Sequence, residues 1–285
     1  MANSIAKNKN YTSMLDEIYK LSSLTSVMDS PPELAKQGAN VNEIIIPKLD
    51  MQGLANYDRN SGYVSGDVTL TQETVPFNYE RGRMFSVDNM DNEESANVAF
   101  GKLSGEFIRT KVVPEIDAFR FATLAQTTGI TVAAPAALTT GKAVLDAIAV
   151  AVAIMDEAEV PTEDRILYIT PTLINLALAV ETSVSKAMLD NLTIIKVPQT
   201  RFYTKITLQN TAAGGFIKET TAGKDINFMI VHKSAILQFF KHINPKVITP
   251  DENQTADAWK FGYRIYGLED VYENKVAGIY LHNKA

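Results

Sequence analysis

Two runs of sequence decide the fold: Val41-Asn42-Glu43-Ile44-Ile45-Ile46-Pro47-Lys48-Leu49-Asp50-Met51 and, further on, Asp67-Val68-Thr69-Leu70-Thr71-Gln72-Glu73-Thr74-Val75. The second run is β-branched and alternates with period two, which is typical of a ribbon solvated on one face. Between the two runs, Asn56-Tyr57-Asp58-Arg59-Asn60-Ser61-Gly62 supplies residues that tolerate a tight reversal. The stretch from Val41 to Asp91 is therefore predicted to form one long β-arm.

This arm has too few apolar side chains to form a core of its own. Ten strand residues at ~3.3 Å each reach roughly 30–35 Å, and an isolated two-stranded ribbon is at best marginally stable in water. We therefore expect another molecule to cover the arm. That expectation favours a subunit of an assembly before any motif is considered.

The composition sets broad limits on the class of protein. Its 285 residues allow either one large domain or two smaller ones, and 46% apolar with 21% charged residues permits a sizeable core. The polar N-terminus lacks the apolar centre of a signal peptide, which argues against secretion by the common route. No apolar run is long enough to cross a membrane, so no membrane partner is expected.

Cysteine content and charge exclude further classes. The chain has no cysteine, which excludes disulfides, thiol nucleophiles and thiolate metal sites and fits an intracellular origin. The net charge of −6 gives no broad attraction to nucleic acid, and a sequence-reading DNA binder normally has a basic face.

The next elements follow from periodicity and turn residues. Residues 1–40 hold an amphipathic segment, Tyr11–Leu21, followed by serines and prolines that predict an extended, partly mobile arm. A long helix is predicted from Asn92 to about Gln126, roughly 50 Å at ~1.5 Å per residue. Pro114 lies inside its pattern and is expected to kink or restart it.

A second region, residues 130–245, alternates helices with strands, which indicates a compact α/β or α+β domain. It contains an apolar helix expected to be buried on most sides, Ala143–Met155, and strands at Arg165–Thr170, Leu192–Pro198 and Ile226–Val231. The tail, residues 246–285, returns to β character at Trp259–Gly267, Val271–Asn274 and Lys275–Leu281.

The sequence contains no recognisable catalytic or metal-binding motif. His232, His242 and His282 are scattered without a metal-type pair, so we expect each to be structural or on the surface. No G-x-S-x-G elbow occurs. Gly141-Lys142 and Gly223-Lys224 each resemble the end of a phosphate loop, but neither is followed by Ser or Thr. No cofactor, metal or enzymatic activity is predicted.

Two weaker candidates have simpler structural explanations. Glu115 and Asp117 are an imaginable acid pair or magnesium site, but two residues apart on a helix they point in different directions, which favours a solvated face. The aromatics from Trp259 to Tyr266 would suit stacking on single-stranded nucleic acid. With Lys260 and Arg264 between them, they are more typical of a strand with one packed face.

The order of these parts resembles the major capsid proteins of tailed bacteriophages, whose fold is named for phage Hong Kong 97. The segments that carry the resemblance are Phe107–Arg120, Leu167–Pro171 and Asp257–Tyr266. They are similar to segments of capsid proteins from phages of low-GC Gram-positive bacteria. The resemblance covers nearly the whole chain and depends mainly on the order of the parts.

The resemblance implies an α+β fold in four parts. These are an N-terminal arm (1–40), an extended β-loop (41–91) that lies over a neighbour, a peripheral domain with a spine helix and a sheet (92–129 and 246–285), and an axial domain (130–245). About forty residues precede the β-loop, too few for a substantial scaffold domain, so a separate scaffold or an extension already removed is expected.

The implied function is structural. The resemblance predicts hexamers and pentamers of an icosahedral shell, which enclose double-stranded DNA without sequence specificity. Its partners would be further copies of the chain, a scaffolding protein, a portal and decoration proteins. Its location would be the virion, after assembly in the host cytoplasm.

Contacts between subunits are expected at exposed aromatic and cationic side chains. The residues chosen are Tyr57, Arg59, Tyr63, Arg81, Arg83, Arg109, Trp259 and Arg264. Some related shells are welded by isopeptide bonds from a lysine near the tip of the arm. Here Lys48 is the only lysine of the arm and lies near its base, while Arg59 at the tip cannot serve. We therefore expect a shell held by non-covalent burial.

Three alternatives remain open. A bacterial encapsulin nanocompartment would share the fold and load enzymes through a docking peptide. An enzyme would assemble its site from scattered residues of the axial domain, and a deep pocket with converging polar groups would favour it. A tail-tube protein is disfavoured because a long helix has little place in a tube built from β-strands.

Overall fold

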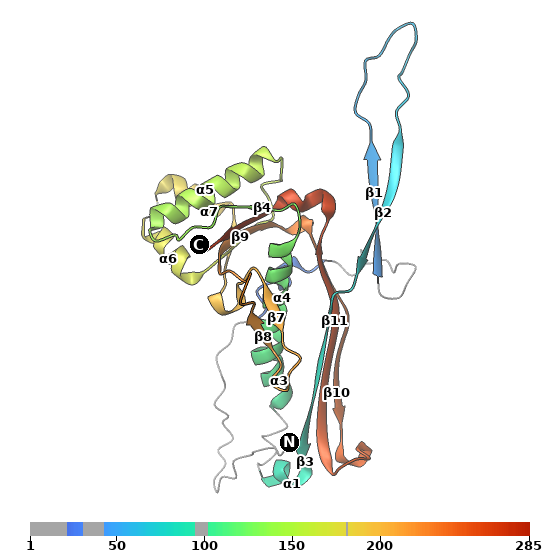
Figure 1. The fold of residues 1–285 in the computed structure, drawn as a ribbon, viewed down its shortest axis with the longest axis vertical. Helices are drawn as coiled ribbons and strands as arrows, with labels where there is room; N and C mark the ends of the chain where they lie inside the picture. The colour runs from blue at the N-terminus through green and yellow to red at the C-terminus, as the bar shows by residue number, and fades with distance from the viewer. Residues whose placement is uncertain (1–21, 31–42, 95–101, 181) are drawn as a thin grey trace.

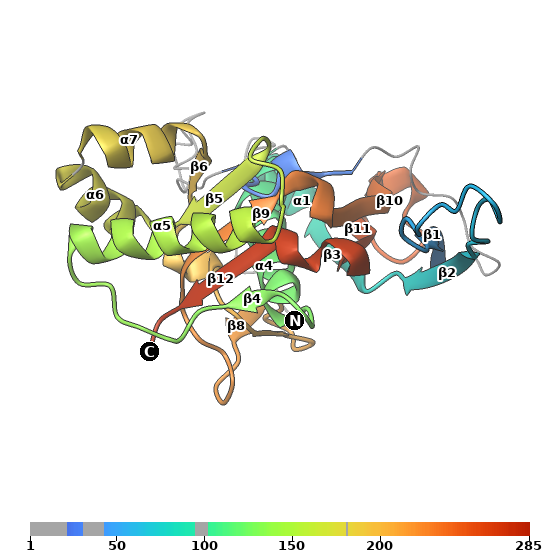
Figure 2. The same ribbon diagram turned by 90° about the horizontal axis from the view of Figure 1, so that it is seen from above.

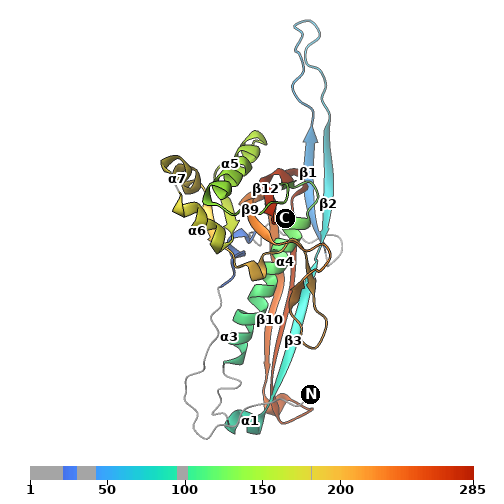
Figure 3. The ribbon, with the colours of Figure 1, turned by 60° about the vertical axis from the view of Figure 1, so that its left-hand side comes forward.

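The computed structural model describes residues 22–30, 43–94, 102–180 and 182–285. The predicted segment Tyr11–Leu21 lies outside these residues. Four sheets and one long interrupted helix organise the described chain, and the hairpin arm rises away from the other elements (Figures 1 and 3).

The predicted arm is confirmed as an antiparallel hairpin. Strand β1 (Glu43–Met51) pairs with β2 (Val68–Pro76), from Glu43 opposite Pro76 to Met51 opposite Val68. The base of the hairpin is held by apolar packing, because Ile44 and Val75 are buried against Leu237 and Leu268 of the body. Beyond the base, most side chains of both strands are exposed.

A three-stranded antiparallel sheet with the order β10-β11-β3 lies below the arm. Its strands are β3 (Tyr79–Asp88), β10 (Ile236–Ile248) and β11 (Ala258–Val271). Residues of β3 were grouped with the arm in the sequence, yet β3 pairs along β11 from Ala258 opposite Asp88 to Gly267 opposite Tyr79. The physical reason is burial: Tyr79 joins Phe261, Tyr263 and Ile265 in a core under the helix.

The described part of the long helix runs from Leu103 to Gln126 and contains a π-helical turn. It consists of α3 (Leu103–Phe107), the π turn η3 (Ile108–Val112) and α4 (Val113–Gln126), and a short helix, α1 (Asn89–Glu94), follows β3. A proline cannot donate the regular backbone bond, and its ring crowds the preceding turn. The wider π turn immediately before Pro114 accommodates both effects. The expected disturbance at Pro114 therefore occurs without breaking the helix.

The second large sheet has five strands in the order β4-β12-β9-β5-β6. They are β4 (Thr131–Val132), β5 (Arg165–Ile169), β6 (Thr193–Lys196), β9 (Ile226–His232) and β12 (Ile279–Asn283). Helices α5 (Gly141–Glu157), α6 (Pro171–Ala179) and α7 (Ser183–Asp190) accompany it (Figure 2).

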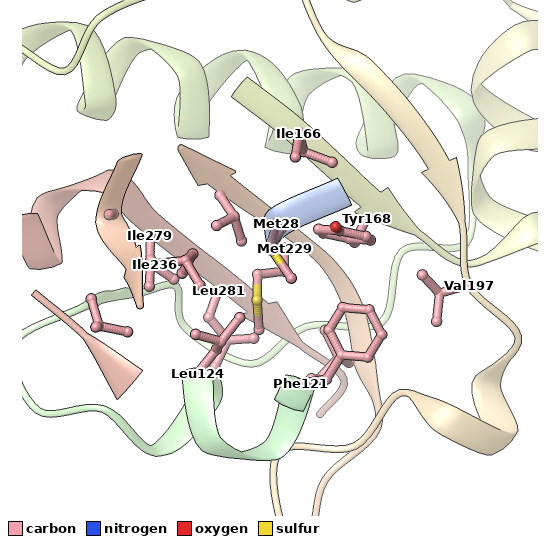
Figure 4. Packing of buried hydrophobic residues seen from close by; sticks show 14 of the residues in the cluster. Met28, Phe121, Leu124, Ile166, Tyr168, Val197, Met229, Ile236, Ile279 and Leu281 are labelled. Carbon is pink, nitrogen blue, oxygen red and sulfur yellow. The ribbon is translucent and has the colours of Figure 1, made fainter. Parts of the chain in front are cut away.

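Both faces of this sheet are covered, which explains its continuous apolar strands. Leu167 and Phe228 pack in one core with side chains of α5 and α6. Tyr168 and Met229 point to the opposite face, where they meet Phe121 of α4 (Figure 4). The end of the long helix therefore joins the two sheets.

Smaller elements complete the described chain. A hairpin pairs β7 (Ile206–Leu208) with β8 (Phe216–Lys218), and Gly214 and Gly215 take positive φ angles in its loop. The short 3₁₀ turns are η1 (Ser26–Met28), η4 (Gln199–Arg201), η5 (Lys233–Ala235), η6 (Pro250–Glu252) and η7 (Glu273–Gly278).

Three expectations about these elements are wrong. Helix α5 is not buried on most sides, because Val150 is 53% exposed and Ile154 is also exposed. Strand β11 continues through Val271, and the predicted strand at Lys275–Leu281 begins only at Ile279, after the 3₁₀ turn η7. That last strand pairs with β9 and lies in the five-stranded sheet, because its five residues are all buried there.

The third correction concerns residues 22–30, which were expected to be extended and partly mobile. They form the 3₁₀ turn η1 and bury Thr25 and Met28 against the body. Met28 packs in the core that also holds Phe121 and Leu124 (Figure 4). Serines and prolines disfavour helix, but the hydroxyl groups also provide hydrogen bonds that fix a non-helical segment.

Candidate assembly surfaces and a buried polar cluster

The tip of the arm has a defined local structure. Asp58 and Gly62 form a bridge in which Gly62 N donates to Asp58 O at 2.7 Å, and Gly62 takes a φ of 81° that favours glycine. Asn60 N donates to Asp58 Oδ1 at 2.8 Å, and this backbone hydrogen bond lowers the pKa of the carboxyl. The rings of Tyr57 and Tyr63 meet edge to face, with centroids 4.8 Å apart.

This ordered tip carries uncovered apolar surface. Tyr63 is 90% exposed and Leu54 is fully exposed. Further exposed apolar side chains of the arm are Leu49, Met51, Val64, Val68 and Leu70. Leu49 faces Leu70 and Met51 faces Val68 across the hairpin, and exposed apolar surface of this kind on a protein marks a binding site for another molecule.

The arm is also fixed to the body by charge at its base. Lys48 Nζ lies 2.8 Å from Glu73 Oε2 of the facing strand and also binds Glu273 of η7. Hydrogen bonds to Glu273 and Glu73 raise the pKa of Lys48. The predicted position of Lys48 near the base is confirmed, and the absence of covalent cross-linking stays a prediction.

A shallow hollow of about 490 Å³ lies on the three-stranded sheet. It is lined by Glu80, Arg81, Gly82, Arg83, Met84, Asn244, Lys246, Gly262, Tyr263 and Arg264. Arg264 Nε donates to Glu80 Oε1 at 3.1 Å across the sheet. The hollow is open, unlike the deep pocket that an enzyme site would offer.

The structure brings six of the eight predicted contact residues into two groups. Tyr57, Arg59 and Tyr63 lie at the tip of the arm, and Arg81, Arg83 and Arg264 line the hollow. The other two lie apart from both groups. Arg109 pairs with Glu106 on the long helix, and Trp259 Nε1 donates to Asn89 Oδ1 at 3.2 Å.

Several of these side chains already have a role inside the subunit. Arg81 Nε donates to Glu115 Oε1 at 2.7 Å, and Arg81 also binds Asn210 Oδ1 and the carbonyl of Gln209. Arg83 Nη1 donates to the carbonyl of Ala213 at 3.3 Å. These bonds hold the β7–β8 hairpin region against β3. A contact of any of them with a neighbouring subunit stays a prediction.

A buried polar cluster lies where residues 22–30 cross the long helix. Asp117, which is completely buried, accepts hydrogen bonds from Ser23 Oγ, Leu24 N, Thr25 N and Thr25 Oγ1 at 2.7–3.3 Å. It also accepts from Arg201 Nη1 at 2.9 Å. One carboxylate of α4 therefore binds both the N-terminal segment and η4.

Arg120, one turn further along α4, contacts the same segment. Its Nη1 donates to Thr25 Oγ1 at 2.9 Å and its Nη2 to Asp29 Oδ1 at 3.0 Å. The guanidinium also lies over the ring of Phe240, 4.6 Å from the centroid. Its Nε is 3.5 Å from Glu269 Oε2, an ion-pair distance that is too long for a normal hydrogen bond.

Expectation and structure differ at Glu115 and Asp117. We predicted a solvated face, but both side chains are buried, and the two carboxylates do point apart into separate sets of bonds. The sequence did contain a signal that predicts burial. Ile116, Ala118 and Phe121 flank Asp117 and place apolar side chains around the helix, which leaves no solvated side. A charge within such a helix must be paired.

The other candidates from the sequence have structural roles. Ser234 Oγ lies 2.9 Å from His232 Nδ1, and Asn227 Nδ2 lies 3.1 Å from His282 Nδ1. Burial lowers the pKa of both imidazoles. Among the described residues no group of three or more His, Asp or Glu side chains is placed to hold a metal ion.

The two glycine–lysine pairs do not form phosphate loops. Gly141 opens α5 against the backbone of Leu176, and Gly223 packs against the backbone of Glu219. Within the described ranges, no helix is both long and apolar enough to cross a membrane.

Comparison with known proteins identifies the fold. No family model and no curated protein matches the sequence. The mature capsid of bacteriophage PhiM1 superposes with a TM-score of 0.69 at 10% identity, over 98% of this chain and 92% of that one. The capsid of cyanophage P-SCSP1u gives 0.67 at 11% identity, over 98% and 93%. This chain has a phage-capsid fold. The resemblance seen in the sequence is confirmed at the level of the fold.

The capsid fold extends to one further kind of particle. A virus-like particle from Pyrococcus furiosus superposes with a TM-score of 0.52 at 11% identity, over 87% of each chain. These comparisons cover most of the chain, so the likeness concerns the fold as a whole.

Proposed function

We propose that this chain is a major capsid protein of a tailed phage or prophage, which assembles into hexamers and pentamers of an icosahedral shell around double-stranded DNA. The observation that carries the proposal is the arm. It is ordered, it is fixed at its base by Lys48, and its apolar side chains are exposed in the single chain. The capsid fold supports the same conclusion.

In this assignment the long helix and the three-stranded sheet form the peripheral domain. The five-stranded sheet with α5, α6 and α7 forms the axial domain near the five- and six-fold centres. The arm lies over a neighbour and is held without covalent bonds, and obligate interfaces of this kind bury about 2,000–5,000 Å². The hollow on the sheet and the tip of the arm are the expected contact surfaces.

The remaining partners follow from the same proposal. A separate scaffolding protein, or an N-terminal extension that has been removed, directs assembly in the host cytoplasm, a portal occupies one vertex, and decoration proteins bind outside. The DNA is held without sequence specificity, in agreement with a net charge of −6. The proposed location of the finished protein is the virion.

The test removes residues 56–65, which include the ordered tip. We expect a soluble, folded subunit that no longer forms closed shells, because the apolar contacts to the neighbour are lost. Electron microscopy of the expressed chain, with and without its neighbouring genes, measures the outcome. Normal closed particles from the deletion would refute the role of the arm.

A compartment shell is the second candidate, because the chain also superposes on the virus-like particle. Mass spectrometry of purified shells separates the two. A cargo enzyme with a docking peptide and no genome favours the compartment, whereas packaged DNA favours the phage head.

A further inference from the structure

Residues 22–30, here called the strap, dock in a polar site instead of an apolar groove. This site, here called the socket, is formed by Asp117 and Arg120 of α4 and Gln238 of β10. Besides its bonds to Asp117 and Arg120, the strap binds Gln238 of β10. Gln238 Nε2 donates to the carbonyl of Thr25 at 3.0 Å, and Ser30 N donates to the carbonyl of Gln238 at 2.9 Å. The socket therefore recognises the strap mainly through hydrogen bonds, and buried Met28 and partly buried Leu24 add apolar anchors.

The charges in the socket balance without Glu269. Arg120 and Arg201 supply two positive charges, while Asp29 and Asp117 supply two negative charges and are bonded to them. Glu269 is 1% exposed, and neither of its carboxyl oxygens has a hydrogen-bond partner among the described residues. An ionised Glu269 would therefore be a fifth, uncompensated charge in a buried site.

The position of Glu269 makes it a competitor for Arg120. The Arg120 guanidinium contacts Asp29 and Thr25 of the strap through its Nη atoms, and its Nε is already 3.5 Å from Glu269 Oε2. When Glu269 is protonated, it does not compete for the Arg120 guanidinium, which stays bonded to the strap. An ionised Glu269 attracts the same guanidinium and repels Asp29.

We propose that the strap is releasable and that the proton on Glu269 governs its docking. The charged and titratable groups that face Glu269 come from every neighbouring element. They are Arg120 of α4, Asp29 of the strap, Asp270 of β11 and Tyr168 of β5. Tyr168 Oη also lacks a hydrogen-bond partner among the described residues, so no neighbour stabilises the ionised form by donating to it.

The direction of the pH effect follows from burial. Burial, only partly opposed by Arg120, raises the pKa of Glu269 to about 8 in the docked state, above the ordinary value of 4.5. The docked state therefore holds a proton that the open state loses. Removal of the strap takes away the Asp29 carboxylate, one of the groups that raise this pKa, so docking weakens as the pH rises toward about 8.

The cysteine-free sequence allows a direct test. Spin labels at Val27→Cys on the strap and Lys142→Cys on α5 report the distance between the strap and the body. Labelled chains are mixed with excess unlabelled chain and measured by pulsed electron resonance at about pH 5 and about pH 9. We expect one docked distance at the low pH and a second, released population that grows at the high pH.

The variant Glu269→Gln is expected to keep the docked distance at both pH values, because it mimics the protonated carboxyl. Glu80→Gln, on the other face of the same sheet, is the matched control and should respond as the unmodified chain does. The proposal is wrong if the unmodified chain shows no released population at about pH 9. It is equally wrong if Glu269→Gln releases the strap at about pH 5. That release would show that an ionised Glu269, paired with Arg120, helps to hold the strap in place.

A second variant keeps the test decisive if Glu269→Gln fails to fold. Asp29→Asn removes the charge that holds Arg120 on the strap, so release is expected already near pH 5. Docking unchanged from the unmodified chain would overturn the competition for Arg120. These measurements use unassembled chain, so their outcome does not depend on whether the protein forms a shell.

Discussion

Arg201 Nη1 lies 2.9 Å from Asp117 Oδ2, and the two side chains are 4% and 0% exposed. This pair joins η4, which follows β6 of the five-stranded sheet, to the middle of α4. Since α4 also packs on the three-stranded sheet, the pair lies where both sheets meet the long helix. The four strap bonds to Asp117 then make the N-terminal segment part of the same junction.

Removal of the Asp117 carboxylate should be among the most damaging single changes in the chain. Asp117→Ala removes the carboxylate from the buried ion pair with Arg201 and takes away the acceptor of four strap bonds, which costs about 3–5 kcal/mol of unfolding free energy. Denaturant unfolding of the unassembled subunit measures the loss. The matched control is Asp146→Ala, which breaks the exposed pair with Lys142 on α5 and should cost less than about 1 kcal/mol. Equal losses in the two variants would show that the buried junction does not stabilise the fold.

Glu269 should make the stability of the subunit fall with rising pH. Its folded-state pKa of about 8 lies above the ordinary value of 4.5, so the folded state binds more protons than the unfolded state in that window. The contribution is fully present below about pH 4.5 and is lost at up to about 1.4 kcal/mol per pH unit as the pH rises through 8. Urea unfolding at several pH values should show a flatter dependence in Glu269→Gln. The same slope in both proteins would mean that Glu269 is ionised when folded.

The sequence predicts the local elements better than their partners. The hairpin arm was predictable because alternation and turn residues act over only a few positions of the sequence. Lys48 therefore lies on β1 and Tyr57 at the tip, as the sequence predicts. The helix before Gln126 was predictable for a similar reason. Its π turn was not, because Pro114 signals a disturbance without specifying its form.

Long-range pairing was beyond sequence reasoning. Strand β12 reads like any short apolar strand, and only its pairing with β9 places it in the five-stranded sheet. The socket was missed for the same reason, since Asp117 and Thr25 are far apart in the sequence and meet only in the fold. Of the eight predicted contact residues, Tyr57 and Tyr63 at the tip are 59% and 90% exposed and so remain open to a partner.

A pair of glycine substitutions should separate close packing from helix propensity. A Cβ at Gly141 would overlap the carbonyl of Leu176 and a methyl group of Val180, so Gly141→Ala must push α5 away from α6. We expect a loss of about 1–3 kcal/mol. In Gly105→Ala the added carbon meets no described atom within 4 Å, and the helix should gain up to about 1 kcal/mol. Thermal unfolding of both variants measures the two changes in stability, which should have opposite signs. A stabilising effect of Gly141→Ala would contradict the tight crossing of α5 and α6.

Truncation of the two tyrosines at the tip should affect assembly and spare the fold. Tyr63 is 90% exposed and contacts Tyr57 only at the edge of its ring, so Tyr57→Ala and Tyr63→Ala should change the unfolding free energy by less than about 0.5 kcal/mol. In an assembled shell the same rings would be buried anchors, and the loss of one such anchor costs about 2 kcal/mol or more per contact. Light scattering should therefore show a higher concentration threshold for assembly with unchanged unfolding of the free subunit. Val132→Ala, an exposed apolar residue distant from the arm, is the control and should assemble normally. If both tyrosine variants assemble as readily as this control, the tip is not the surface that holds neighbouring copies together.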